Sequence, residues 1–211
     1  MKQSILLPLI LLIAFTSGWA QKITKESIRS GEKTRKYYLF VPDKIDASVP
    51  VIVTLHGSGR NGLSLVETWK DIAKTERIII AGPDALDSGG WRIPADGPDF
   101  IRDLIEALKA KYRIDDRRVY LFGHSAGAGQ ALYLSLLQSE YFAATAVHAG
   151  ALAADDHDYI KAAARKIPIA IFFCSNGEVC PLPTVRATRD AQKSAGPRAA
   201  PRKVMMLPAP A

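Results

Sequence analysis

The pattern of apolar and polar positions along the chain predicts a layered domain of strands and helices. Continuous apolar or β-branched runs predict strands at residues 37–41, 49–55, 77–81, 118–122, 142–147 and 167–173. Apolar residues at helical spacing predict helices at residues 99–112, 126–137 and 184–195. Because strands alternate with helices, the expected fold class is α/β, with a mainly parallel sheet and helices on both faces.

Both ends of the chain depart from this pattern. Residues 1–20 combine a positive start at Lys2, an apolar run and small residues up to Ala20, as in a secretory signal peptide. The run is shorter than the roughly 20 residues that span a bilayer, so we expect a secreted, extracellular or periplasmic protein without a stable membrane anchor. Residues 197–211 are rich in proline, and their apolar residues follow neither the helical nor the strand period. This predicts an irregular or disordered tail after a single domain at 21–196.

Charge and cysteine content narrow the expected partners. The formal net charge is +7, but Arg198, Arg202 and Lys203 lie in the tail, and no basic stripe with interleaved aromatics appears elsewhere. We therefore expect no nucleic-acid partner. Cys174 and Cys180 are close in the sequence, and a secreted chain enters an oxidising compartment. This favours a local disulfide between them over two buried thiols. No further metal-ligating residues cluster near them, so no metal site is expected.

The segment LFGHSAGAGQAL places Ser125 in the pattern Gly123-x-Ser125-x-Gly127. This is the nucleophile-elbow pattern, and the predicted strand before it and the small-residue helix after it are the context that the elbow requires. A serine held in such a turn exposes its hydroxyl for attack on an acyl group. The alternative is a glycine-rich turn with an incidental serine.

A second glycine-rich loop follows the strand at 49–55. The segment VIVTLHGSGRNG predicts a loop whose backbone N–H groups stabilise an oxyanion. We expect one donor from the N–H of Ser58 or Gly59 and the other from Ala126, the residue after the nucleophile. The alternative is a plain polar turn between a strand and a helix.

These motifs resemble a known family. RKYYLFVP, VIVTLHGSGRNG, GPDA, GGWRIPADGPDFIRDLIEALKAKYRIDDRRVYLFGHSAGA and AVHAGAL together resemble the secreted α/β-hydrolase esterases of the polyhydroxybutyrate depolymerase and feruloyl or acetyl-xylan esterase group. The resemblance runs from about Arg35 to Gly196. It implies an α/β-hydrolase fold and ester hydrolysis through an acyl-enzyme on Ser125, with neither metal nor cofactor.

The resemblance also implies partners for Ser125 that the chain does not supply clearly. In this family the catalytic acid matches the position of Gly177, so Glu178 beside it is the candidate acid, with a surface glutamate as the alternative. The family's histidine would lie beyond Gly196, where this chain has none. We therefore expect the last strand and helix, with the catalytic histidine, to be missing.

The four histidines present lie earlier in the chain. His56 belongs to the oxyanion loop, and His124 precedes the nucleophile. His148 follows a predicted strand, and His157 lies in a polar loop. A displaced base among them is the alternative to a missing one.

Three functions are compatible with these motifs. The first is a secreted serine esterase, a monomer acting on polymeric or aromatic esters of the polyester, feruloyl or acetyl type. The second is an inactive hydrolase-fold protein that serves as a binding module. The third is another acyl hydrolase, such as a peptidase or phospholipase, because the fold hosts many chemistries. Trp91 is a candidate substrate contact, with packing as the alternative.

Overall fold

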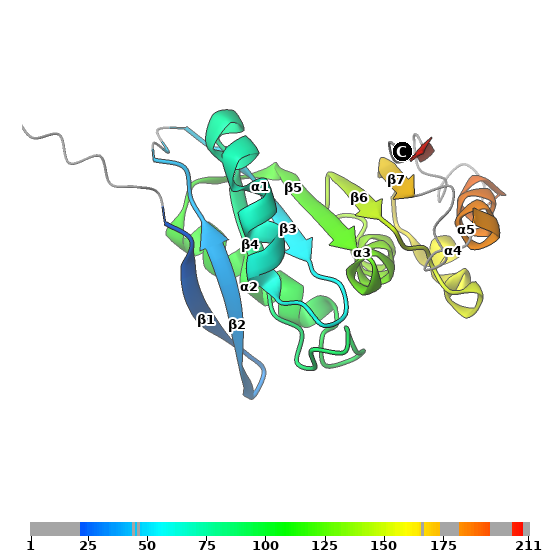
Figure 1. Cartoon of the computed structure of the whole chain (residues 1–211), viewed down its shortest axis with the longest axis horizontal. Coiled ribbons are helices and arrows are strands. Elements are labelled where there is room, and N and C mark those ends of the chain that lie inside the picture. The colour runs from blue at the N-terminus through cyan, green and yellow to red at the C-terminus, as the bar shows by residue number, and fades with distance from the viewer. Residues whose placement is uncertain are drawn as a thin grey trace, which may run out of the picture.

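Eight strands form one sheet in the described part of the chain, which comprises residues 22–43, 45, 47–165, 167–173, 182–194 and 204–208 of a computed structural model (Figure 1). The strand order is β1-β2-β4-β3-β5-β6-β7-β8. The strands are β1 (Thr24–Ser30), β2 (Lys33–Phe40), β3 (Val49–Leu55), β4 (Ile79–Pro83), β5 (Ile114–His124), β6 (Ala144–His148), β7 (Ile169–Phe173) and β8 (Val204–Pro208). The pairs β1–β2 and β2–β4 are antiparallel and the other pairs are parallel, which confirms the predicted mainly parallel sheet.

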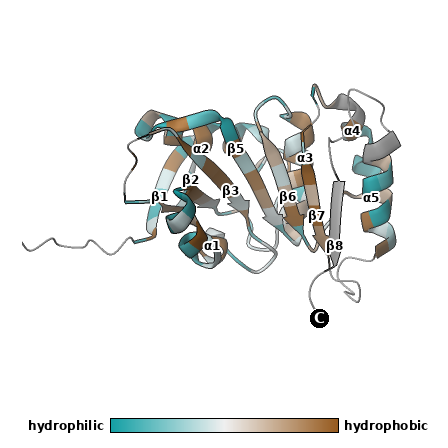
Figure 2. Ribbon diagram, turned by 90° about the horizontal axis from the view of Figure 1, so that it is seen from above, coloured by the Kyte–Doolittle hydropathy of each residue, from teal (hydrophilic) through white to brown (hydrophobic). Residues whose placement is uncertain are grey.

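Helices cover both faces of the sheet. They are α1 (Gly62–Glu76), α2 (Pro98–Lys111), α3 (Ala126–Leu137), α4 (Asp158–Ala162) and α5 (Leu182–Ser194), with a short 3₁₀ turn η1 (Ala154–Asp156). Figure 2 shows α1 on one side of the sheet and α2 and α3 on the other. Proline at the first helical position suits the start of α2, because its missing N–H would have no partner there. None of the helices in the described ranges is long and apolar enough to cross a membrane.

Two clusters of buried side chains fill the space between the sheet and the helices on its two faces. The larger lies between the sheet and α2, α3 and their neighbours, and it includes Leu104 and Leu132. The smaller lies under α1 and consists of Phe40, Val66, Ala73 and Ile80. Strand side chains alternate between the two faces of the sheet. The larger cluster includes Val51 and Val53 of β3 and Leu121 of β5, the strands that lead into the candidate oxyanion loop and the elbow. The smaller cluster takes its strand residues from β2 and β4.

An apolar groove of about 320 Å³ lies on the α1 side of the sheet, over β5, β6 and β7. Tyr120, Phe122 and three alanines form its floor, and Trp69 of α1 forms one wall. Small side chains on β6 and β7 next to large ones on β5 leave this hollow. Over these three strands the α1 side therefore presents apolar side chains in a groove.

The structure corrects the predicted tail. Val204–Pro208 forms β8, which pairs in parallel with β7 from Ile169↔Val204 to Phe173↔Pro208. The prediction of an irregular segment at 197–211, and of a missing last strand, is wrong for these five residues. The apolar run Val-Met-Met-Leu is typical of a parallel strand, and Pro208 stands at its end. The predicted signal peptide and the predicted loss of a helix after the last strand fall on residues outside the described ranges.

Candidate active site

Ser125 lies in a sharp turn between β5 and α3, with backbone angles of φ 55° and ψ −119°. A residue with a side chain rarely adopts such angles, and holding it there costs about 1–3 kcal/mol. Two glycines permit the turn. A Cβ on Gly123 would lie 2.2 Å from the Gly127 carbonyl oxygen, and a Cβ on Gly127 would lie 2.0 Å from the Leu55 carbonyl oxygen. This is the backbone geometry that the G-x-S-x-G pattern predicts.

The elbow is held from two further sides. The Ser125 N–H donates to the His148 carbonyl oxygen at 2.9 Å, which ties the turn to the end of β6. On the other side lies Gly57, where an added Cβ would be 3.2 Å from the Cβ of Ser125. The loop after β3 therefore passes directly beside the serine.

The predicted oxyanion donors lie in this loop and at the start of α3. The Gly59 N–H donates to the Ser88 carbonyl oxygen at 2.7 Å, so it is already engaged. The N–H groups of Ser58 and Ala126 donate no hydrogen bond to any described residue. A Cβ built on Gly90 would lie 3.8 Å from Ser58 Oγ and 3.9 Å from Ala126 Cβ, which places these two residues close to the same point. Of the two loop candidates, Ser58 is therefore the available donor.

The loop at residues 84–97 holds the oxyanion loop in place through His56. The Trp91 Nε1–H donates to the His56 carbonyl oxygen at 2.8 Å, and the two rings lie 5.0 Å apart between centroids. The Ala85 N–H donates to His56 Nε2 at 3.1 Å, and His56 Nδ1 lies 2.9 Å from the Gly57 carbonyl oxygen. Both ring nitrogens of His56 are therefore engaged in buried structural contacts. Trp91 packs in this cluster, and its role in substrate contact stays a prediction.

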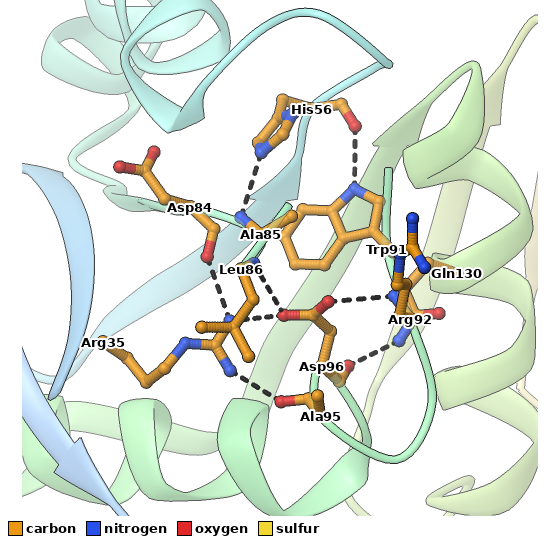
Figure 3. Close-up of polar contacts among 10 residues, drawn as sticks. All are labelled: Arg35, His56, Asp84, Ala85, Leu86, Trp91, Arg92, Ala95, Asp96 and Gln130. Carbon is orange, nitrogen blue, oxygen red and sulfur yellow. Dashed lines mark hydrogen bonds and ion pairs between the residues drawn. The ribbon is translucent and has the colours of Figure 1, made fainter. Parts of the chain in front are cut away.

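A buried ion pair anchors the 84–97 loop (Figure 3). Arg35 of β2 is 3% exposed and Asp96 is fully buried, with 2.5 Å between Arg35 Nη2 and Asp96 Oδ1. Asp96 also accepts the N–H groups of Leu86 at 3.1 Å and Arg92 at 2.9 Å. The Arg35 guanidinium donates to the Ala95 carbonyl oxygen at 2.7 Å. One carboxylate thus holds the 84–97 loop, which packs against the loop of the candidate oxyanion donor Ser58.

Two histidines meet beside the nucleophile. His124 and His148 are direct partners in the β5–β6 register; their rings are stacked 5.0 Å apart between centroids, and their Nδ1 atoms lie 2.9 Å apart. One Nδ1 must donate and the other accept, so two imidazolium rings would place N–H against N–H. Burial, together with the charges of His148 and Arg60, lowers the pKa of His124 below its usual value of about 6.5.

A cleft of about 570 Å³ opens beside Ser125. Apolar side chains of α1 and β5 form one part of its wall, and the oxyanion loop and the two histidines form the other. It is lined by Gly57, Ser58, Arg60, Ser64, Leu65, Thr68, Trp69, Ile72, Phe122, His124, Ser125 and His148. His56 and His157 do not line it. A ligand in this cleft would therefore lie beside Ser125 and the candidate oxyanion donor Ser58.

Ser125 Oγ has no hydrogen-bonded side chain among the described residues that could accept its proton. His124 and His148 line the same cleft and are the candidates for that role. Buried His157 Nε2 has no hydrogen-bond partner in the described ranges. Glu178, Cys174 and Cys180 lie outside these ranges, so the candidate acid and the disulfide stay predictions. The described residues contain no group of three or more side chains able to hold a metal ion.

Comparison with known proteins shows which family this chain resembles. Residues 94–171 match the esterase PHB depolymerase family. The family resemblance drawn from the motifs is thereby confirmed. The matched segment contains Asp96, the whole elbow and the His124–His148 pair, whereas the oxyanion loop lies before it.

Two known enzymes are similar to a larger share of the chain. A poly(3-hydroxyalkanoate) depolymerase C of Paucimonas lemoignei is 24% identical over 71% of this chain and 40% of its own length. A bifunctional acetylxylan esterase/xylanase of Neocallimastix patriciarum is 26% identical over 49% of this chain and 16% of its own length. The chain thus matches less than half the length of either relative. A solved ferulic acid esterase superposes with a TM-score of 0.72 at 18% identity over 90% of both chains, which confirms the α/β-hydrolase fold.

Proposed function

We propose that the chain is a secreted serine esterase that hydrolyses carboxylic esters through an acyl-enzyme on Ser125. One observation carries the proposal: a strained serine lies between two backbone N–H groups, those of Ser58 and Ala126, that have no partner in the described ranges. Unused donors beside a strained nucleophile serve no structural purpose. They suit a carbonyl oxygen that becomes negative during acyl transfer.

The reaction follows from this arrangement. Ser125 Oγ attacks the ester carbonyl carbon and passes its proton to a base, while the carbonyl oxygen becomes an oxyanion held by the two N–H groups. The tetrahedral intermediate collapses, and the alcohol takes up a proton and leaves. Water then hydrolyses the ester on Ser125 by the same steps. His124 and His148 are the cleft-lining candidates for the base, and Glu178 is the candidate acid.

The substrate class follows from the relatives and the cleft together. The relatives are named for polyhydroxyalkanoate and acetylxylan, and the solved neighbour for ferulic acid. Apolar Leu65, Trp69 and Phe122 beside the serine suit the acyl part of such esters. We infer a polymeric or aromatic ester outside the cell, reached after removal of residues 1–20, with the protein acting as a monomer.

A second candidate function is a binding module that keeps the elbow without turnover. It is favoured by the serine hydroxyl, which has no hydrogen-bonded base among the described residues. In serine hydrolases, loss of the base lowers the rate by about 10⁴–10⁶. Such a protein would still bind esters in the cleft.

Hydrolysis of p-nitrophenyl butyrate by residues 21–211 tests the first function against the second. The variant Ser125→Ala should abolish turnover. Ser64→Ala is the matched control, because Ser64 lines the same cleft but its hydroxyl donates to the Asn61 carbonyl oxygen at 2.8 Å. Its rate should equal that of the unmodified chain. Equal background rates in all three folded proteins would exclude the esterase and leave the binding module.

A further inference from the structure

Among the described residues that line the cleft beside Ser125, one side chain is permanently charged, the guanidinium of Arg60. The other side chains that line it are apolar, hydroxyl or imidazole groups, and no described aspartate or glutamate is among them. The hydroxyls of Ser64 and Thr68 donate to backbone carbonyl oxygens at 2.8 Å each. From the described residues, an anion in this cleft would therefore meet a single fixed positive charge and no negative one.

Arg60 has no hydrogen-bond or ion-pair partner among the described residues, unlike three other arginines of the chain. Its exposed guanidinium makes no hydrogen bond and no ion pair with any residue of the described ranges. Arg35, Arg92 and Arg102 each pair with an aspartate, at 2.5, 2.7 and 2.6 Å. An arginine can donate two parallel hydrogen bonds to one carboxylate. In Arg60 the two guanidinium N–H groups that would form them are open to a ligand.

The backbone holds Arg60 next to the reacting centre. Its N–H donates to the Gly57 carbonyl oxygen at 3.2 Å, which closes a turn with Ser58 and Gly59 at the corner. Gly59 has φ +70°, which such a turn requires at its third residue. The candidate oxyanion donor Ser58 and the charge of Arg60 thus belong to one turn, and that charge adds to the effect of burial, which lowers the pKa of His124.

We propose that Arg60 forms an anion subsite of this cleft and selects esters whose acyl group ends in a free carboxylate, such as half-esters of dicarboxylic acids. The inference rests on the proposed function, because it assumes that the ester carbonyl lies at Ser125. With the carbonyl oxygen at Ser58 and Ala126, the methylene groups lie against Leu65 and Trp69, and the distal carboxylate pairs with the guanidinium. One guanidinium matches one carboxylate in charge and in geometry.

Two substrates of equal chain length test this subsite. Mono-p-nitrophenyl glutarate carries the distal carboxylate, and p-nitrophenyl valerate lacks it. The ratio of their kcat/KM values should fall about tenfold in Arg60→Gln, which corresponds to roughly 1.4 kcal/mol, and recover in large part in Arg60→Lys. Arg102→Gln is the matched control, because it removes the same charge from a paired arginine on α2, outside the cleft. In Arg102→Gln the ratio of the two kcat/KM values should equal that of the unmodified chain.

Direct binding separates failure of the subsite from failure of the esterase. Titration calorimetry with glutarate at low salt should show binding to the unmodified chain and about tenfold weaker binding to Arg60→Gln, whether or not esters are hydrolysed. Valerate hydrolysis with an unchanged substrate ratio in Arg60→Gln would overturn the subsite and leave the esterase. Glutarate binding without any ester hydrolysis would support the subsite and overturn the esterase. Equal or absent glutarate binding would overturn the subsite in either case.

Discussion

Replacement of Asp96 by alanine should destabilise the fold more than any single change at the surface. Asp96 is fully buried and balances the charge of Arg35, which is 3% exposed. Without the carboxylate the guanidinium stays buried and uncompensated, which costs about 3–5 kcal/mol. Two backbone N–H groups, those of Leu86 and Arg92, also lose their acceptor, at about 1 kcal/mol each, although such losses do not add fully. We expect a total of about 5 kcal/mol, which equals the whole stability of a marginally stable domain.

Urea unfolding at pH 7, followed by tryptophan fluorescence, measures this loss. Asp99→Ala is the matched control, because Asp99 lies three residues away and pairs with Arg102 at 2.6 Å on the exposed face of α2. That surface pair should contribute less than about 1 kcal/mol. The double replacement Arg35→Met with Asp96→Leu should recover much of the loss, since no unpaired charge remains. An Asp96→Ala variant within about 1 kcal/mol of the unmodified protein would refute the argument that no other described carboxylate balances the buried charge of Arg35.

Three further changes test the site from other directions. Gly127→Ala should lower the free energy of unfolding in urea by at least about 2 kcal/mol, because its Cβ would lie 2.0 Å from a backbone oxygen. Gly129→Ala, with its nearest contact at 3.4 Å, should change that free energy by less than about 1 kcal/mol. Trp91→Phe should cost about 1 kcal/mol in the same assay, because the His56 carbonyl oxygen loses its donor. The pKa of His124 is lowered in the folded state, so its contribution to stability is fully present above the unfolded-state pKa of about 6.5 and is lost as the pH falls from there through the lower folded-state pKa. The drop in urea midpoint from pH 8 to pH 5.5 should therefore be smaller in His124→Gln, and an equal drop would contradict it.

The elements that the sequence predicts best are those with the plainest patterns. Residues 49–55 form a continuous β-branched strand, and residues 126–137 form a helix, and the structure places both with the predicted bounds. Helix α1 was not predicted, because the side of it that packs inward is built from small and mixed residues. Gly62, Val66, Trp69 and Ala73 recur at helical spacing, but glycine and alanine weaken the apolar signal. Strand β1 is polar and exposed at the sheet edge, so it carries no apolar signal either.

The residues of the site also fall into two groups, those that local sequence motifs predict and those that only the folded chain brings together. The elbow and the oxyanion loop are local motifs, so a few adjacent residues predict them. The Arg35–Asp96 pair joins residues 61 positions apart, and the His124–His148 contact depends on the register of two parallel strands. Neither leaves a local signal in the sequence. The sequence shows that Arg60 lies in the glycine-rich loop, but only the folded chain shows that its guanidinium has no partner among the described residues.

The strain at Ser125 is held by parts of the fold that do not depend on a catalytic base. The Leu55 carbonyl oxygen of β3 closes on Gly127, and the His148 carbonyl oxygen of β6 accepts the Ser125 N–H. These contacts would hold the elbow equally well in an esterase and in a binding module. The shape of the turn and the reactivity of the hydroxyl are therefore separate properties, because reactivity needs a proton acceptor. Covalent labelling by a fluorophosphonate reports reactivity directly: labelling that is lost in Ser125→Ala requires an activated serine, whereas no labelling of a folded protein means that strain alone does not activate it.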